Sequence, residues 1–388
     1  MRRITTEERR ARLGTRHHLA VRADDVVDVA RDLVGLHSSD PATVYLAARA
    51  RVDRFSTEDL ERALYDDRTL LRLLGMRRTI FVVPRDIAAV IDAGCTRALA
   101  LPQRRRLIGL LIDQGIAEDA EAWLADVERK TMAALERRGE ATGAELRSDM
   151  PEFKESLQFG EGKTWGGFTG VSTRVLFLLA TASKIVRARP KGSWVSSQYR
   201  WTPLERWLGG PLPALDPADA RTELVRRWLA AFGPGTLIDI KWWTGWTVRD
   251  TKAAVAAAGA VEVELDNGVG YVLAGDDDAP VPAEWVALLP GLDPTAMGWK
   301  ERAWYFGDHV PSLFDRNGNA GPTIWWNGRV IGGWAQRKTG QIVHRLLEAV
   351  PSDVAEQVEA EAADLERWLG DVVVTSRFPT PLDRDLRS

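Results

Sequence analysis

The sequence predicts an α+β protein with three tandem winged helix-turn-helix modules followed by a C-terminal β-rich, barrel-like domain. Two observations support this fold class: a group of helices followed by a hairpin recurs three times, and the last third is rich in tryptophan and strand signals. A chain of 388 residues is long enough for two to four domains. The boundaries between the repeats predict domains at 1–115, 116–210, 211–275 and 276–388.

The first module is predicted from helical periodicity followed by two short apolar strands. A short charged helix at 5–15 precedes it, and the strands flank Gly75-Met76. Three arginines lie on the predicted wing: Arg72, Arg77 and Arg78. The expected helices and strands are 24–37, 41–50, 57–66, 70–74 and 79–83.

The second module repeats this order with a capping signal. Thr142 and Glu145 have capping-box spacing, which predicts the start of a short helix. Residues 153–170 are polar, aromatic and glycine-rich, and they predict a long loop. The other expected elements are helices 119–138 and 171–182 and strands 184–189 and 194–201.

The third module has the clearest signals. Helices 237–243 and 248–258 each begin with a Thr-x-x-Asp cap, after a first helix at 218–232. The segment 261–273 predicts a hairpin, because Asp266-Asn267-Gly268 favours a tight turn between its two strands.

The C-terminal domain follows an acidic, proline-containing linker at 275–283. The segment 324–331 predicts a hairpin with an Asn-Gly turn. A strand at 341–346 and an amphipathic helix at 352–369 follow, and the prolines of 377–382 predict an extended tail.

Composition excludes several classes of protein. Cys95 is the single cysteine, so no internal disulfide can form, and the five histidines show no metal-ligand spacing. We therefore expect no metal and no cofactor. No apolar run approaches the roughly 20 residues of a membrane span, and the N-terminus lacks the apolar core of a signal peptide. These features predict a cytoplasmic, nucleoid-associated monomer that does not contact a membrane.

The charge distribution points to a polyanionic partner. Residues 1–110 carry 21 Lys and Arg against 15 Asp and Glu, whereas the remainder carries 31 against 40. A basic N-terminal third on an acidic body predicts a localised contact with a polyanion such as double-stranded DNA, although such a charge excess also suits a solvated surface.

One corner of the chain combines polar side chains with two helix ends. Pro41 suits the first position of a helix, and Ser39 or Asp40 can cap that helix. His37 ends the preceding predicted helix, so it converges with Ser39 and Asp40 on a corner that can hold a water or an anion. The alternative is structural, because Ser-Asp-Pro is an ordinary N-cap and His37 can bond the last carbonyls of its helix.

Four segments resemble one known family. They are LVGLHSSDP (33–41), RRTIFVVP (77–84), FDRNGNAGP (314–322) and GGWAQ (332–336). Together they resemble the winged-helix DNA-binding family of actinobacterial proteins that includes the AlkZ and YcaQ (AlkX) DNA glycosylases, over essentially the whole chain. The catalytic motif of those glycosylases is Gln, an aromatic or aliphatic residue, then Gln or Asp. This sequence has His37-Ser38-Ser39 in that position.

The resemblance implies hydrolysis of the N-glycosidic bond of bulky N7-alkylated or crosslinked purines in duplex DNA. In that reaction His37 would hold a water and act as its base, since its reference pKa is near neutral. Ser39 would contribute a hydrogen bond, and Asp40 would supply negative charge toward a cationic transition state. The alternative is a noncatalytic DNA-binding protein that senses lesions or regulates genes and has lost the glycosylase motif.

DNA contacts would come from basic residues on wings and loops, since phosphates need only Lys or Arg. The candidates are Arg77, Arg78, Lys191, Arg329, Arg337 and Lys338. The resemblance gives Arg329 a special role, because a C-terminal β-hairpin of those glycosylases reaches the minor groove. A sequence-specific regulator is disfavoured, because 171–179 is apolar and Arg249 and Lys252 lie among alanines rather than on a dedicated reading helix.

Overall fold

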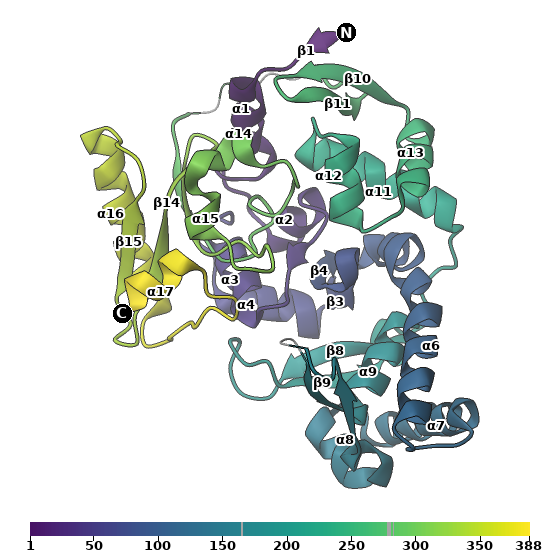
Figure 1. Cartoon of the computed structure of the whole chain (residues 1–388). Helices are drawn as coiled ribbons and strands as arrows, with labels where there is room; N and C mark the ends of the chain where they lie inside the picture. The colour runs from purple at the N-terminus through teal and green to yellow at the C-terminus, as the bar shows by residue number, and fades with distance from the viewer. Residues whose placement is uncertain (164–165, 278–280, 282) are drawn as a thin grey trace.

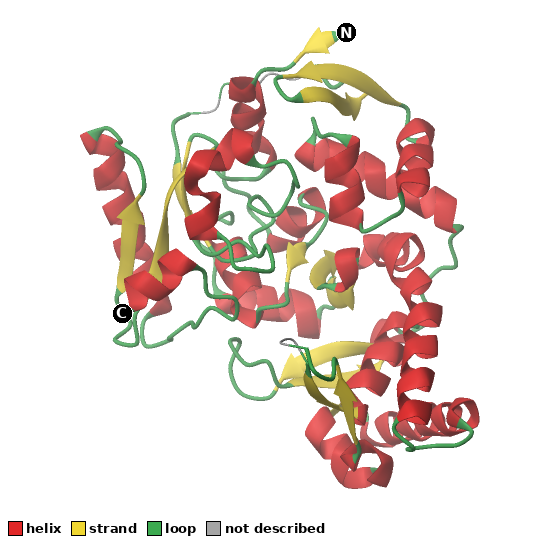
Figure 2. Cartoon of the chain, in the orientation of Figure 1, coloured by secondary structure: helices red, strands yellow, loops and turns green. Residues whose placement is uncertain are grey.

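The computed structural model describes residues 1–163, 166–277, 281 and 283–388, and it mixes helices with small antiparallel sheets (Figure 2). The predicted α+β class is confirmed. Helices and hairpins alternate along the chain, and the hairpins predicted at 69–83, 184–201 and 261–273 lie in three separate three-stranded sheets. No sheet continues through two of them.

The first unit (residues 26–84) has a sheet in the order β2-β4-β3. The predicted helix 24–37 is wrong at its end, because the helix stops at Asp32 and Leu36–His37 pair with β4 instead. Gly35 explains the break: its φ is +107°, and an added Cβ would lie 2.8 Å from Val83. The unit comprises α2 (Val26–Asp32), β2 (Leu36–His37), α3 (Pro41–Arg49), α4 (Thr57–Glu61), β3 (Leu70–Leu74) and β4 (Ile80–Pro84).

A long helix, α6 (Arg97–Asp113), joins the first unit to the second and has no counterpart among the predicted elements (Figure 1). The second unit (residues 120–203) has a sheet in the order β5-β9-β8. The loop predicted at 153–170 is wrong in part, because the hairpin β6 (Ser156–Phe159) and β7 (Gly167–Gly170) occupies it. The other elements are α7 (Ala120–Arg138), β5 (Ala141–Thr142), α8 (Gly143–Asp149), α9 (Val171–Thr181), β8 (Ile185–Pro190) and β9 (Tyr199–Pro203).

The third unit (residues 217–273) is completed by the N-terminus. The strand β1 (Arg2–Arg3) pairs in parallel with β10, so the first residues of the chain lie beside this hairpin (Figure 1). Both predicted caps form, with Thr236 and Thr247 as N-cap residues. The unit comprises α11 (Pro217–Phe232), α12 (Leu237–Thr244), α13 (Val248–Ala257), β10 (Ala260–Leu265) and β11 (Gly268–Leu273).

The C-terminal region (residues 286–387) contains an open antiparallel sheet rather than the expected barrel. Its order is β12-β13-β14-β15, so within the described chain the outer strands do not pair with each other to close it. The predicted extended tail is wrong at its end, where Pro381 begins a helix. Part of the predicted linker 275–283 lies outside the described residues. The elements are β12 (Val286–Leu289), α14 (Ala303–Phe306), α15 (Val310–Leu313), β13 (Thr323–Trp326), β14 (Arg329–Gln336), β15 (Ile342–Leu346), α16 (Ser352–Leu369) and α17 (Pro381–Arg387).

One extensive core joins the first unit, the third unit and the C-terminal region, whereas the second unit is built largely around apolar residues of its own. A buried ion pair crosses the larger core. Arg51 donates to both carboxylate oxygens of Asp293, at 2.7 and 2.9 Å, and neither side chain is exposed. The chain segment that follows α3 is thereby fixed against the segment that precedes β13.

Candidate functional site

His37 is the last residue of β2 and is only 3% exposed. It pairs with Phe81 of β4, and the two rings meet edge to face with their centroids 5.0 Å apart. Burial, with a smaller contribution from the cation of Arg77, lowers the pKa of His37 to about 3. The imidazole is therefore neutral at physiological pH.

The hydrogen bonding of His37 defines its tautomer. The backbone N–H of Ser39 donates to Nδ1 at 3.4 Å, so Nδ1 is the unprotonated nitrogen. The proton of the neutral ring therefore lies on Nε2, which has no hydrogen-bond partner among the described residues. In this tautomer His37 presents a hydrogen-bond donor, whereas a general base would need an unprotonated nitrogen facing its substrate.

Asp40 caps α3, and the capping oxygen accepts from the N–H of Ala42 at 3.1 Å. Its second oxygen accepts from the backbone N–H of Arg377 at 3.0 Å. The Arg377 guanidinium also donates to the Ser39 carbonyl at 3.4 Å. Burial raises the pKa of Asp40, and these hydrogen bonds oppose the rise. The carboxylate thus joins the start of α3 to the C-terminal tail.

Ser38 lies between His37 and Ser39 and makes the contact that sequence reasoning missed. Its hydroxyl accepts a hydrogen bond from the buried Arg72. Arg72 also donates to the hydroxyls of Tyr199 at 2.9 Å and Tyr65 at 3.4 Å. Arg72 does lie on the β3–β4 hairpin that was predicted as a wing, but it is buried, and these hydroxyls solvate its cation inside the fold. No local signal pointed to this contact, because the extended chain at β2 depends on pairing with β4.

Arg77 and Arg78 follow each other in the β3–β4 turn but differ in environment. The guanidinium of Arg77 stacks over Trp242 of α12, 4.0 Å from the ring centroid. Burial, and then the nearby cation of Arg302, lower the pKa of Arg77 to about 10. Arg78 is exposed. Arg77 therefore belongs to the contact between the first and third units, while Arg78 faces solvent.

The other four predicted DNA contacts lie on separate turns. Lys191 is exposed at the end of β8, and Lys338 is exposed in the β14–β15 turn beside Arg337. Arg337 donates to the carbonyl of Leu386 and the side chain of Gln341, both at 3.3 Å.

Arg329 begins β14, where it forms an ion pair with Glu348 at 3.2 Å and stacks on Trp326. The tip of its hairpin is packed against α1 (Thr6–Arg16), because an added Cβ at Gly328 would lie 2.5 Å from the Arg10 carbonyl. The hairpin thus meets another part of the protein at the position where the sequence predicts a groove contact.

Among the described residues, no three His, Cys, Asp or Glu side chains gather as a metal site would need. A search of the same residues finds no helix both long and apolar enough to span a membrane.

The class of protein follows from the sequence family, which the three helix–hairpin units and the C-terminal sheet accommodate as one continuous fold. The sequence model of the family described as DNA glycosylase AlkZ-like matches residues 30–368, and the chain belongs to this family. The Streptomyces sahachiroi DNA glycosylase AlkZ has a similar structure, with a TM-score of 0.73 at 20% identity. That alignment covers 97% of this chain and 99% of AlkZ. No curated protein matches the sequence.

Proposed function

We propose that the protein is a DNA glycosylase that acts on duplex DNA. The observation that carries the proposal is the family match, which spans 30–368 and so includes the corner of His37, Ser39 and Asp40. We propose further that the first, second and third units are winged helices. The first unit supports this with its order of helix, short strand, two helices and hairpin. The second unit has the same order with the β6–β7 hairpin inserted between its last two helices, and the third has the Gly235–Tyr271 bridge.

The proposed substrate is a bulky N7-alkylated or crosslinked purine. Alkylation at N7 makes the base cationic and weakens its bond to the sugar, so the enzyme needs mainly to stabilise a cationic sugar and position a water. A metal is not required for this chemistry. The corner offers hydrogen-bonding groups suited to that task.

Within the corner we assign His37 the role of donor. Its Nε2–H can orient a water or a phosphate oxygen, and Ser39, whose backbone N–H donates to the same ring, adds a hydroxyl two residues further along the chain. The expected role of His37 as general base is disfavoured by its pKa of about 3. Asp40 acts through its negative charge and not as a free carboxylate, since each oxygen accepts a backbone hydrogen bond.

We assign the DNA contacts by the exposure of each basic side chain and by the partners that it already has. Arg78, Lys191 and Lys338 are exposed and are proposed to bind phosphates. We propose that Arg77 holds the wing against Trp242. Arg329 and Arg337 would bind DNA only if a phosphate replaced their present partners. Such exchange costs the interactions that it breaks, so these three contribute less.

The second candidate is a DNA-binding protein without turnover. One observation favours it: His37, the expected base, is buried with a pKa of about 3, and Asp40, the expected source of negative charge, caps α3. A lesion-sensing or regulatory protein would need the binding surface but not a reactive corner.

Base release from duplexes that carry N7-methylguanine or an interstrand crosslink separates the two candidates. A glycosylase releases free base and leaves abasic sites. His37→Ala should cut the rate about a hundredfold or more, because it removes a positioned hydrogen-bond donor, while binding to undamaged duplex stays nearly unchanged. His18→Ala, in the same region but paired with Asp32, is the matched control and should keep the rate.

The double change His37→Gln with Ser39→Gln restores the family pattern and should preserve or raise activity. If the natural chain releases no base and the double variant does, the second candidate is correct. A rate that is flat from pH 5 to 8 supports His37 as donor, because its neutral form dominates throughout. A rate that falls below pH 6.5 contradicts that role.

A further inference from the structure

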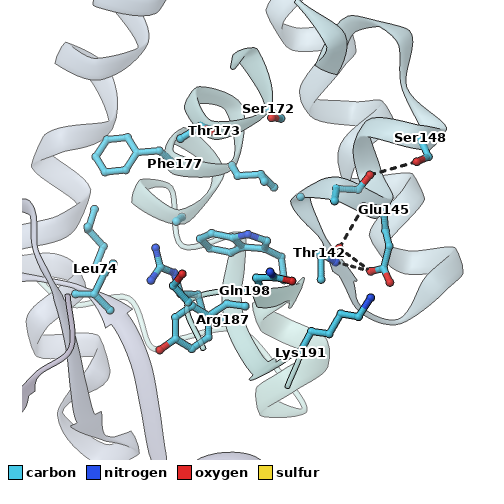
Figure 3. Close-up of a pocket in the computed structure, with 18 residues that line it drawn as sticks. Leu74, Thr142, Glu145, Ser148, Ser172, Thr173, Phe177, Arg187, Lys191 and Gln198 are labelled. Carbon is cyan, nitrogen blue, oxygen red and sulfur yellow. Dashed lines mark hydrogen bonds between the residues drawn. The ribbon is translucent and has the colours of Figure 1, made fainter. Parts of the chain in front are cut away.

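A cavity of ≈ 620 Å³ lies between the hairpin of the first unit and the second unit (Figure 3). Leu74 and Ile80 form its wall on the first unit, and the rest comes from β5, α8, α9, β8, β9 and the segment between β8 and β9. Its size is that of a small-molecule site. Neither His37 nor Ser39 lines it, so it is separate from the corner described above.

Arg187 of β8 is the central charge of the cavity. Its guanidinium lies between the rings of Tyr199, 5.0 Å away, and Trp201, 5.2 Å away. Its Nε is enclosed without a hydrogen-bond partner, and no described carboxylate forms an ion pair with it. Burial lowers the pKa of Arg187 to about 10; Tyr199 opposes this effect, and the cation of Arg72 adds a smaller lowering. A cation enclosed in this way lacks an anion.

The one carboxylate that borders the described cavity is not the counter-ion of Arg187. Glu145 is the only acidic side chain that lines the described cavity, and its carboxylate accepts from the N–H and hydroxyl of Thr142, at 2.7 and 3.0 Å. Lys191 extends from β8 toward Glu145 in Figure 3, so the positive charge of this lysine and that of Arg187 border the same space.

Flat apolar surface completes the lining. Phe177 and Trp201 are half-buried and border the cavity, and Gln198 and Thr173 add exposed polar groups. Aromatic rings beside arginine provide a stacking surface for a nucleobase, and the guanidinium provides a fork for phosphate oxygens.

We propose that this cavity binds one nucleotide unit, with its base on Trp201 and Phe177 and its phosphate on Arg187 and Lys191. The inference goes beyond the proposed glycosylase activity and does not depend on turnover. The unit can come from free mononucleotide or from a DNA strand, which share the chemistry of a phosphate next to an aromatic base.

The cavity also has a structural connection to the corner. The guanidinium groups of Arg72 and Arg187 both stack on the ring of Tyr199, and that of Arg72 lies 4.7 Å from the ring centroid. Arg72 also donates a hydrogen bond to Ser38, which lies between His37 and Ser39. An anion at Arg187 relieves the repulsion between the two guanidinium groups, and so it stabilises the arrangement that holds Ser38.

Calorimetric titration of the full chain with deoxyadenosine 5′-monophosphate, deoxyadenosine and a six-residue single-stranded oligodeoxynucleotide tests the proposal. The monophosphate should bind at least about tenfold more tightly than the nucleoside, because the nucleoside lacks the charge-assisted hydrogen bonds. Arg187→Gln should weaken the monophosphate about tenfold or more, and Lys191→Gln should weaken it less. Lys184→Gln, an exposed lysine before β8, is the matched control and should have no effect.

Thermal denaturation of the same variants distinguishes a loss of binding from a loss of folding. Arg187→Gln should not lower the melting temperature of the free protein, since it removes an unpaired enclosed cation, but it should abolish the rise caused by the monophosphate. Tighter binding of the oligonucleotide than of the monophosphate identifies a strand as the source, and the reverse identifies the free nucleotide. If neither ligand responds to Arg187→Gln, or if both bind no better than deoxyadenosine, the proposal is overturned.

Discussion

The buried ion pair between Arg51 and Asp293 gives the sharpest stability prediction. All five guanidinium donors of Arg51 are used: two on Asp293, and one each on the carbonyls of His17 and Ala47 and the hydroxyl of Thr295. Asp293→Ala removes two of these bonds and leaves a cation with no counter-charge in a site that is 0% exposed.

The expected cost follows from this environment. Breaking one partner of a buried pair costs about 3–5 kcal/mol, because the remaining charge has lost its solvent and its partner. The matched control is Asp149→Ala, since Arg138 also donates two hydrogen bonds to the Asp149 carboxylate, at 2.6 and 2.7 Å, but on the surface. That change should leave the free energy of unfolding nearly unchanged, because water solvates either ion alone.

Urea unfolding followed by tryptophan fluorescence measures both variants. Asp293→Ala should lower the midpoint strongly, and Asp293→Asn should fall between it and the natural protein, because an amide keeps one acceptor but loses the charge. If Asp293→Ala lies within about 1 kcal/mol of the natural protein, or matches Asp149→Ala, the reasoning about desolvation at this site is refuted.

Three further predictions concern the corner and the wing. Because the folded pKa of His37 is about 3 and the unfolded value is near 6.5, the buried neutral ring stabilises the fold above pH 6.5, and this contribution is lost as the pH falls. Between pH 7 and pH 5 the free energy of unfolding should fall by about 2 kcal/mol through this group. Urea unfolding over this range should show a smaller fall for His37→Gln than for the natural protein. An equal fall would show that another group titrates. Asp40→Ala removes the N-cap of α3 and the acceptor for the Arg377 N–H. Amide hydrogen exchange at residue 377 should therefore become faster, while exchange in α7 stays the same. An unchanged exchange rate at residue 377 would show that other contacts hold the tail. Arg78→Ala should reduce the slope of log affinity for duplex DNA against log salt by about one, and Arg77→Ala should change it less, since Arg77 is stacked on Trp242; the opposite ranking would make Arg77 the phosphate contact.

Local chemistry in the sequence determined the helix starts and the tight turns. Thr142, Thr236 and Thr247 cap the helices that their spacing predicts, and Asp40 caps α3. The Asn-Gly turn of the β13–β14 hairpin also forms where the dipeptide predicts it. These features depend on groups within about four residues of one another, so a single sequence contains the whole interaction.

The positions of the charged groups were decided by the tertiary structure. Arg72 and Arg77 look like equivalent wing residues in the sequence, but Tyr199 and Trp242 enclose them from two other units. The strand β2 exists because Leu36 and His37 meet β4, some 45 residues later, and the same pairing buries the ring of His37. The pKa of an imidazole and the accessibility of a guanidinium depend on which distant surfaces remove water from them, and no local spacing in the chain specifies those surfaces.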